Sequence, residues 1–219
     1  MLNPVILVKS GGLIYQPSNT LRGNFGLLKY AGLRKASSSG SVSRSLADNV
    51  IKSKGTTSAT HREFLLNPRT GIILPTPTAG YIQGFFNRTN SDGAHTLNFL
   101  LGVTNETPSE FSGWVIGLNG FYGGSGYNFA YMGRWISGSY QGETALTNSG
   151  MNPGTWFRAR VDGDRVRVYV SPTETDLNTR SPIIDVTLPY SGSLIGGVGL
   201  MFGHPSGGSE SFISNVTIS

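Results

Sequence analysis

The chain of 219 residues contains no cysteine. This absence excludes a disulfide-stabilised scaffold, cysteine-ligated zinc, iron–sulfur clusters and catalysis by a thiol. No apolar run approaches the roughly 18 residues that a membrane-spanning helix needs. The apolar stretch Met1–Val8 is short and lacks the basic start of a signal peptide. We therefore expect no membrane partner and no conventional secretion.

Charged residues are scarce, at 13% of the chain, where an ordinary globular domain has about 25%. Much of the remaining polar composition is Gly, Ser, Thr and Asn, and the chain contains 31 Gly and 11 Pro. So many turn-forming residues argue against a helical bundle and favour short strands joined by turns. The predicted fold is all-β, an antiparallel β-sandwich or jelly roll preceded by a basic N-terminal arm.

Lysine is absent after Lys54, and basic charge is concentrated near the N-terminus. Residues 1–60 carry 8 − 1 = +7, whereas residues 61–219 carry 9 − 11 = −2. We therefore divide the chain into a basic anchoring segment, residues 1–60, and a body, residues 61–219. The basic charges are spread out and not interleaved with aromatic residues, which favours docking on an acidic protein, or a role in solubility alone, over binding to nucleic acid. The predicted anchoring residues are Lys9, Arg22, Lys29, Arg34 and Lys35.

The body is a succession of short apolar or alternating stretches separated by turn residues, a spacing typical of a sandwich. Within the anchoring segment, Ala36–Ser41 has the composition of a flexible linker, and Val42–Ser53 fits a helix or a strand equally well. The strands predicted in the body are His61–Leu66, Tyr81–Asn87, Thr96–Val103, Phe111–Leu118, Tyr127–Ile136, Ile183–Leu188, Gly196–Phe202 and Ser211–Ile218.

The stretch Thr155–Val170 predicts a β-hairpin, because Asp162-Gly163 between two alternating runs is typical of a type I′ turn. This turn sets Arg160 opposite Arg165, and like charges opposed in a sheet are destabilising. A bound anion, acids from a neighbouring strand or a partner subunit would offset them; the alternative is a solvated face. Phe157, Ala159, Val166 and Val168 are then buried. The opposite face shows Trp156, Arg158, Arg160, Arg165, Arg167 and Tyr169.

A second candidate site is the aromatic, glycine-rich stretch Phe121–Tyr127 with the aromatic residues that follow it. Aromatic faces could stack on a sugar ring, and amides could bond to its hydroxyl groups. The alternative is that these aromatics pack in the core or in a subunit interface. The predicted glycan-binding residues are Tyr122, Tyr127, Trp135 and Tyr140, with the amides of Asn119 and Asn128.

The C-terminal part of the chain resembles concanavalin-A-like lectin and glucanase sandwiches, including laminin-G-like domains. The resemblance rests on the hairpin Thr155–Val170, on Pro182–Val186, on the Gly-Gly-Val-Gly-Leu-Met-Phe-Gly of residues 196–203 and on Phe212–Ile218. It covers residues 150–219 well and 61–150 loosely, and it does not reach residues 1–60. It implies a sandwich fold and says little of function, because this fold has many functions.

The resemblance does not extend to catalysis. Glucanases of this fold carry Glu-x-Asp-x-x-Glu, with two carboxylates flanking the glycosidic bond. Here Glu174-Thr175-Asp176 lacks the final acid. His61, His95 and His204 are scattered without metal-ligand spacing. We expect no enzymatic activity, no metal and no cofactor.

The low charge and the Gly/Ser/Thr/Asn content resemble those of bacteriophage particle proteins. We therefore interpret the chain as a non-catalytic accessory protein of a virion, a capsid decoration or a tail or fibre component. It would be made in the host cytoplasm, form homo-oligomers, bind coat or tail proteins through residues 1–60 and adhere to host glycans. The alternatives are a free-standing carbohydrate-binding lectin module and a degenerate glycoside hydrolase.

Overall fold

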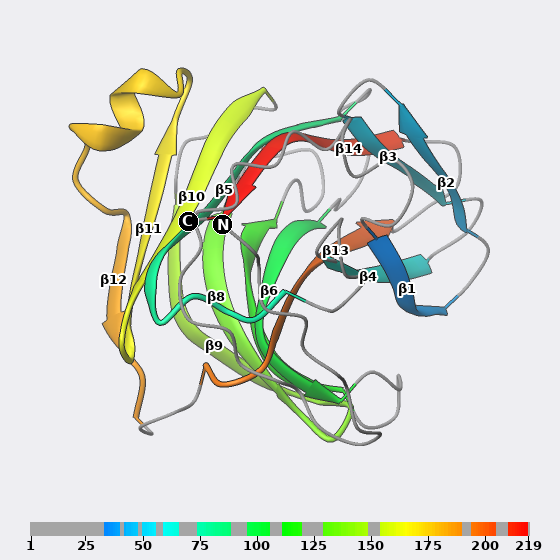
Figure 1. Ribbon diagram of the computed structural model, residues 1–219, viewed down its shortest axis with the longest axis horizontal. Helices are drawn as coiled ribbons and strands as arrows, with labels where there is room; N and C mark the ends of the chain where they lie inside the picture. The colour runs from blue at the N-terminus through cyan, green and yellow to red at the C-terminus, as the bar shows by residue number, and fades with distance from the viewer. Residues whose placement is uncertain are drawn as a thin grey trace, which may run out of the picture.

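The described part of the chain forms two antiparallel β-sheets of seven strands each, packed face to face (Figure 1). The predicted all-β sandwich is confirmed. The computed structural model describes residues 33–39, 42–47, 50–55, 59–65, 74–88, 96–105, 111–119, 129–148, 154–189, 194–204 and 210–218. Across these ranges, none of the helices has the length and apolar character needed to cross a membrane.

Sheet A carries the predicted hairpin near one edge. Its strand order is β12 (Ile184–Thr187), β11 (Arg165–Ser171), β10 (Thr155–Asp162), β5 (Ala79–Arg88), β14 (Glu210–Ile218), β3 (Val50–Gly55) and β2 (Val42–Ala47). A short 3-10 helix, η1 (Thr175–Asn178), follows β11. Each predicted strand of the body overlaps a strand of the structure.

Sheet B has the strand order β1 (Leu33–Ser39), β4 (Ala59–Leu65), β13 (Gly197–His204), β6 (Thr96–Asn105), β7 (Ser112–Asn119), β8 (Phe129–Ile136) and β9 (Ser139–Asn148). It is strongly curved, with β4 and β1 turned toward the outer face of the sheet (Figure 1).

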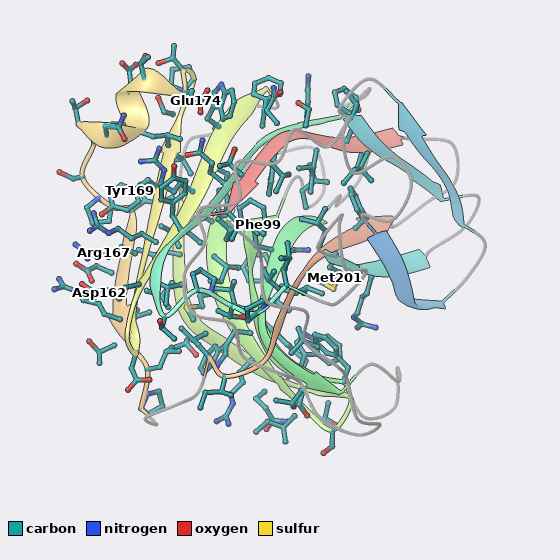
Figure 2. The ribbon with its side chains drawn as sticks, viewed as in Figure 1. Phe99, Asp162, Arg167, Tyr169, Glu174 and Met201 are labelled. Carbon is teal, nitrogen blue, oxygen red and sulfur yellow. The ribbon has the colours of Figure 1, made fainter. Side chains whose placement is uncertain are left out.

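The core between the sheets is centred on three phenylalanines. Phe86 and Phe157 come from sheet A, and Phe99 comes from sheet B. Their ring centroids lie 5.0 Å (Phe86–Phe99), 5.1 Å (Phe86–Phe157) and 5.5 Å (Phe99–Phe157) apart. All three side chains are almost completely buried, so this trio joins the two sheets. Figure 2 shows Phe99 between them.

Three strands of the predicted anchoring segment belong to the sandwich. β1 pairs with β4 of sheet B, and β3 pairs with β14 and β2 in sheet A. Ile51, on β3, is fully buried in the main core. The domain boundary placed at residue 61 therefore falls inside the sandwich, which extends at least to Leu33. The expected flexible linker was wrong for Ala36–Ser39, which are part of β1.

The anchoring role of residues 1–60 stays a prediction. Lys9, Arg22 and Lys29 lie outside the described residues. Arg34 and Lys35 are placed on β1 by their backbone, opposite Phe64 and Glu63 of β4.

Candidate functional site

The faces of the β10–β11 hairpin are those that its alternation predicts. Phe157, Ala159, Val166 and Val168 are buried in the core. The other side chains lie on the outer face of sheet A. Figure 2 shows three residues of this side, Asp162, Arg167 and Tyr169, along the outer edge of the sandwich.

The predicted register of this hairpin was wrong by one residue. The two turn residues are Gly163 and Asp164, because Asp162 pairs with Arg165. Gly163 has φ of 61°, and Asp164 is not at positive φ. Glycine first in a two-residue turn is typical of type II′, whereas type I′ needs positive φ at both positions. As a result Arg160 lies opposite Arg167, and Arg158 opposite Tyr169.

These side chains form a regular array with their neighbours, which we call the arginine face. In successive rows across β5, β10, β11 and β12, Arg158 lies between Gln83 and Tyr169, and Arg160 between Tyr81 and Arg167. The alternation within the predicted strand Tyr81–Asn87 could have identified Tyr81, Gln83 and Phe85 as members of this face. The arginine face comprises Tyr81, Gln83, Phe85, Trp156, Arg158, Arg160, Asp162, Arg165, Arg167, Tyr169 and Asp185.

One arginine of this face is fully paired. Arg165 donates from Nε and Nη2 to the two carboxylate oxygens of Asp185, each at 2.7 Å. These hydrogen bonds lower the pKa of Asp185. Asp185 comes from β12, so acids on a neighbouring strand, one of the three expected ways to offset the arginines, are present here. Arg167 has a weaker contact, 3.3 Å from Nη2 to Asp162 Oδ2.

Arg158 is the centre of a polar network at the η1 end of the arginine face. Its Nε donates to Gln83 Oε1 at 2.8 Å, and its Nη1 donates to Asn178 Oδ1 at 2.9 Å. The guanidinium lies 4.6 Å from the Tyr81 ring centroid, close enough for a cation–π interaction. Burial, the largest influence, lowers the pKa of Arg158. Gln83 in turn donates to Glu174 Oε1 at 2.7 Å.

The second candidate surface lies on the outer face of sheet B, where β8 and β9 form a hairpin. Ser137 and Gly138 both have positive φ, at 46° and 77°, as a type I′ turn requires. This turn sets Trp135 opposite Tyr140, with ring centroids 5.4 Å apart. The Tyr140 ring lies over Gly133. A Cβ atom at residue 133 would lie 2.7 Å from Cε2 of this ring, so only glycine allows the ring to take this position.

Trp135 also contacts two residues that the sequence did not single out. Its ring packs edge to face on Phe111, with the ring centroids 6.1 Å apart. The Arg62 guanidinium carbon lies 4.7 Å from the ring centroid of Phe111 and 5.2 Å from that of Trp135. Arg62 is on β4, four strands from Trp135 on β8, or roughly 19 Å in a flat sheet. Their contact follows from the curvature of sheet B. We call Trp135, which packs on the buried Phe111, and Tyr140 the aromatic surface.

Most of the curved face beside the aromatic surface is filled by its own side chains. Asn98 is fully buried; it donates to the Met201 carbonyl at 3.2 Å and accepts from the Tyr131 hydroxyl at 2.6 Å. A Cβ at Gly117, between β6 and β8, would overlap the Asn98 side chain. Tyr140, by contrast, is 40% exposed, and Trp135 is half-buried. The accessible part of this face is therefore the Trp135–Tyr140 end.

Among the described residues, the structure brings together two of the predicted glycan-binding residues, Trp135 and Tyr140. Tyr122, Tyr127 and Asn128 lie outside the described residues, and Asn119 is placed on β7 by its backbone. The contact of Phe111 and Arg62 with Trp135 had no local signal, because these residues are distant in sequence.

The acidic stretch near the end of β11 is a turn of helix. Glu174 precedes η1, and Asp176 lies within it. Figure 2 shows Glu174 beside η1, at the edge of the sandwich. Within the described ranges, no group of three or more His, Asp or Glu residues could hold a metal ion. The expected absence of catalysis, metal and cofactor stays a prediction.

No family model matches the chain, and no curated protein matches it. Solved structures do. The carbohydrate-binding module CBM66 from Bacillus subtilis is 10% identical with a TM-score of 0.59, over 86% of this chain and 96% of that one. The VIP36 exoplasmic/lumenal domain bound to Ca²⁺ and Man3GlcNAc is 12% identical with a TM-score of 0.58, over 83% and 82%.

The carbohydrate recognition domain of Emp46p, in its potassium-bound form, is 12% identical with a TM-score of 0.52, over 83% of this chain and 87% of that one. At such low identity these likenesses show the fold alone. The chain has the β-sandwich fold of concanavalin-A-like lectins, as the C-terminal motifs predict.

Proposed function

We propose that the chain is a non-catalytic carbohydrate-binding protein that contacts its glycan through Trp135 and Tyr140. The observation that carries this proposal is the position of the Tyr140 ring, which is partly exposed and lies over Gly133 beside Trp135. An aromatic face fixed in this way can pack on a sugar ring without losing much conformational freedom. The similar structures named as carbohydrate-binding or carbohydrate recognition domains support this choice.

The non-catalytic part of the proposal is supported by the position of Glu174. Glycosidases place two carboxyl groups on either side of the scissile bond. Glu174 instead accepts a hydrogen bond from Gln83 beside η1, and it lies on the opposite sheet from Tyr140. A glycan bound at the aromatic surface would therefore not meet this carboxylate.

Substitution of Tyr140 by alanine is expected to weaken glycan binding about thirtyfold, the effect of losing an aromatic hot spot. Tyr140→Phe keeps the ring and should stay within about threefold of the wild type, since only the hydroxyl is lost. The measurement is a glycan array, followed by titration calorimetry with the best glycan. Circular dichroism checks that both variants fold. Failure of the wild-type chain to bind any glycan would refute the proposal, and full binding by Tyr140→Ala would exclude this surface.

We further propose that the chain is an accessory component of a virus particle, anchored through the basic segment. The charge asymmetry supports this, because residues 1–60 carry +7 while the rest of the chain is close to neutral. A basic segment attracts acidic surfaces of neighbouring proteins. Because strands β1–β3 are part of the sandwich, the anchoring role is best tested at Lys9, Arg22 and Lys29, which precede the described sandwich in the sequence.

The light-scattering mass of the full chain is expected to be that of a defined oligomer. Replacing Lys9, Arg22 and Lys29 by serine should give a monomer, because the variant loses the three basic charges that precede the described sandwich. High salt should have the same effect on the wild-type chain. A monomeric wild type would contradict an assembly role for this segment, and so would an oligomer that the triple variant retains.

A further inference from the structure

We propose that Arg160 and Arg167, on the outer face of sheet A, bind the carboxylate or sulfate group of an acidic carbohydrate. The site lies on the opposite sheet from Trp135 and Tyr140, so it is a second binding site beyond the proposed function. It would give one sandwich two carbohydrate-binding faces.

The two arginines are opposed without adequate compensation. Arg160 and Arg167 face each other directly in the β10–β11 register, an arrangement that destabilises a sheet when nothing offsets it. Asp185 lies opposite Arg167 on the other side, but both of its carboxylate oxygens bind Arg165. The remaining acid, Asp162, contacts Arg167 only at 3.3 Å.

Each arginine retains free hydrogen-bonding capacity. The Nε of Arg167 is buried and has no hydrogen-bond partner within the described part of the chain. Arg160 is exposed and forms neither a hydrogen bond nor an ion pair with any described residue. An oxyanion held between the two guanidinium groups would accept charge-assisted hydrogen bonds from both, and guanidinium geometry suits carboxylate and sulfate oxygens.

The residues around the pair favour a sugar as the carrier of this anion. Tyr81 lies beside Arg160 on β5, and Tyr169 lies two residues after Arg167 on β11. Both rings are half-buried. Because the Arg158 guanidinium already lies over the Tyr81 ring, Tyr169 offers the larger aromatic surface beside the two arginines. The exposed amide of Asn178 is held in place by Arg158. Aromatic faces with a few fixed polar groups are typical of small-ligand sites.

The test is titration calorimetry of the full chain against four polymers. Polygalacturonate carries carboxylates, dextran sulfate carries sulfates, dextran is uncharged, and polyglutamate carries its carboxylates on a peptide. We expect binding to polygalacturonate, to dextran sulfate or to both, and none to dextran. The anionic sugar that binds identifies the preferred group. Equal binding to polyglutamate would overturn the assignment to carbohydrate, and failure to bind either anionic sugar would overturn the site.

Two arginine variants separate a site from general attraction. Arg160→Gln should weaken binding about tenfold, the loss expected for charge-assisted hydrogen bonds. Arg160 is exposed, so this variant should fold normally. Arg180→Gln removes the same charge from an exposed position just after η1, outside the arginine face, and should change binding by less than about twofold. Equal losses in the two variants would overturn the proposal.

A third variant distinguishes this site from the one in the proposed function. Tyr140→Ala should leave binding of the acidic polymer unchanged, and Arg160→Gln should leave binding at the aromatic surface unchanged. Loss of acidic-polymer binding in Tyr140→Ala would place the anion at sheet B and overturn the second site.

Discussion

A chain that begins at residue 61 will lose cooperative unfolding, whereas a chain that begins at residue 33 will keep it. The shorter chain lacks β1, β2 and β3 together with the start of β4, so β14 loses its neighbour β3 and becomes an open edge of sheet A. It also lacks Ile51, which is fully buried in the main core. Thermal melts followed by circular dichroism measure the difference.

A single substitution in the full chain separates the loss of core packing from the loss of strands. Ile51→Ala should reduce the free energy of unfolding by about 2–5 kcal/mol while leaving every strand in place. If the chain that begins at residue 61 melts cooperatively near the transition temperature of the full chain, the pairing of β3 with β14 does not stabilise the sandwich and the prediction is contradicted.

Substitution of Phe157 by alanine is expected to lower the free energy of unfolding by about 3–5 kcal/mol. Phe157 stacks on Phe86 within sheet A and packs against Phe99 of the facing sheet. It is fully buried, so its removal leaves a cavity between the sheets that the surrounding strands can fill only in part. Urea unfolding at constant protein concentration measures the loss.

Trp156 provides a matched control, because it directly precedes Phe157 on β10 and lies on the opposite face. Its ring is half-buried and contacts Phe85 edge to face at 5.7 Å. Trp156→Ala should cost about 1 kcal/mol, the scale of one aromatic pair on the surface. Equal losses for Phe157→Ala and Trp156→Ala would contradict the central place of the phenylalanine trio in the core.

Turn-forming residues and short strand-like stretches predicted the fold class, and alternation predicted both faces of the β10–β11 hairpin. In a strand, successive side chains point to opposite faces, so the run from Phe157 to Val168 shows which residues are buried without any knowledge of the turn. The same alternation in the predicted strand Tyr127–Ile136 places Tyr131 and Trp135 on one face, where Tyr131 belongs to the second buried cluster of sheet B and Trp135 packs against it. The two-residue alternation of side chains within each strand was enough for these predictions.

Register and curvature could not be predicted in the same way. The Asp-Gly pair suggested a turn one residue too early, because glycine is accepted at positive φ in either position of a two-residue turn. The contact between Arg62 and Trp135 depends on the curvature of sheet B, which no short stretch of sequence encodes. The strand Leu33–Ser39 has four residues of linker composition, Ala36–Ser39, and it is a strand because β4 lies beside it.

The pairing of β3 with β14 has a consequence for how the protein is made. Val50 pairs with Ser214, which is 214 − 50 = 164 residues later. Contacts so distant in sequence slow folding, because a long loop must close before they form. During synthesis on the ribosome, β2 and β3 emerge long before their partner β14. Until the last strand is released, these segments remain exposed to unwanted association with other chains, and a slow, late folding step should limit the yield of the native protein.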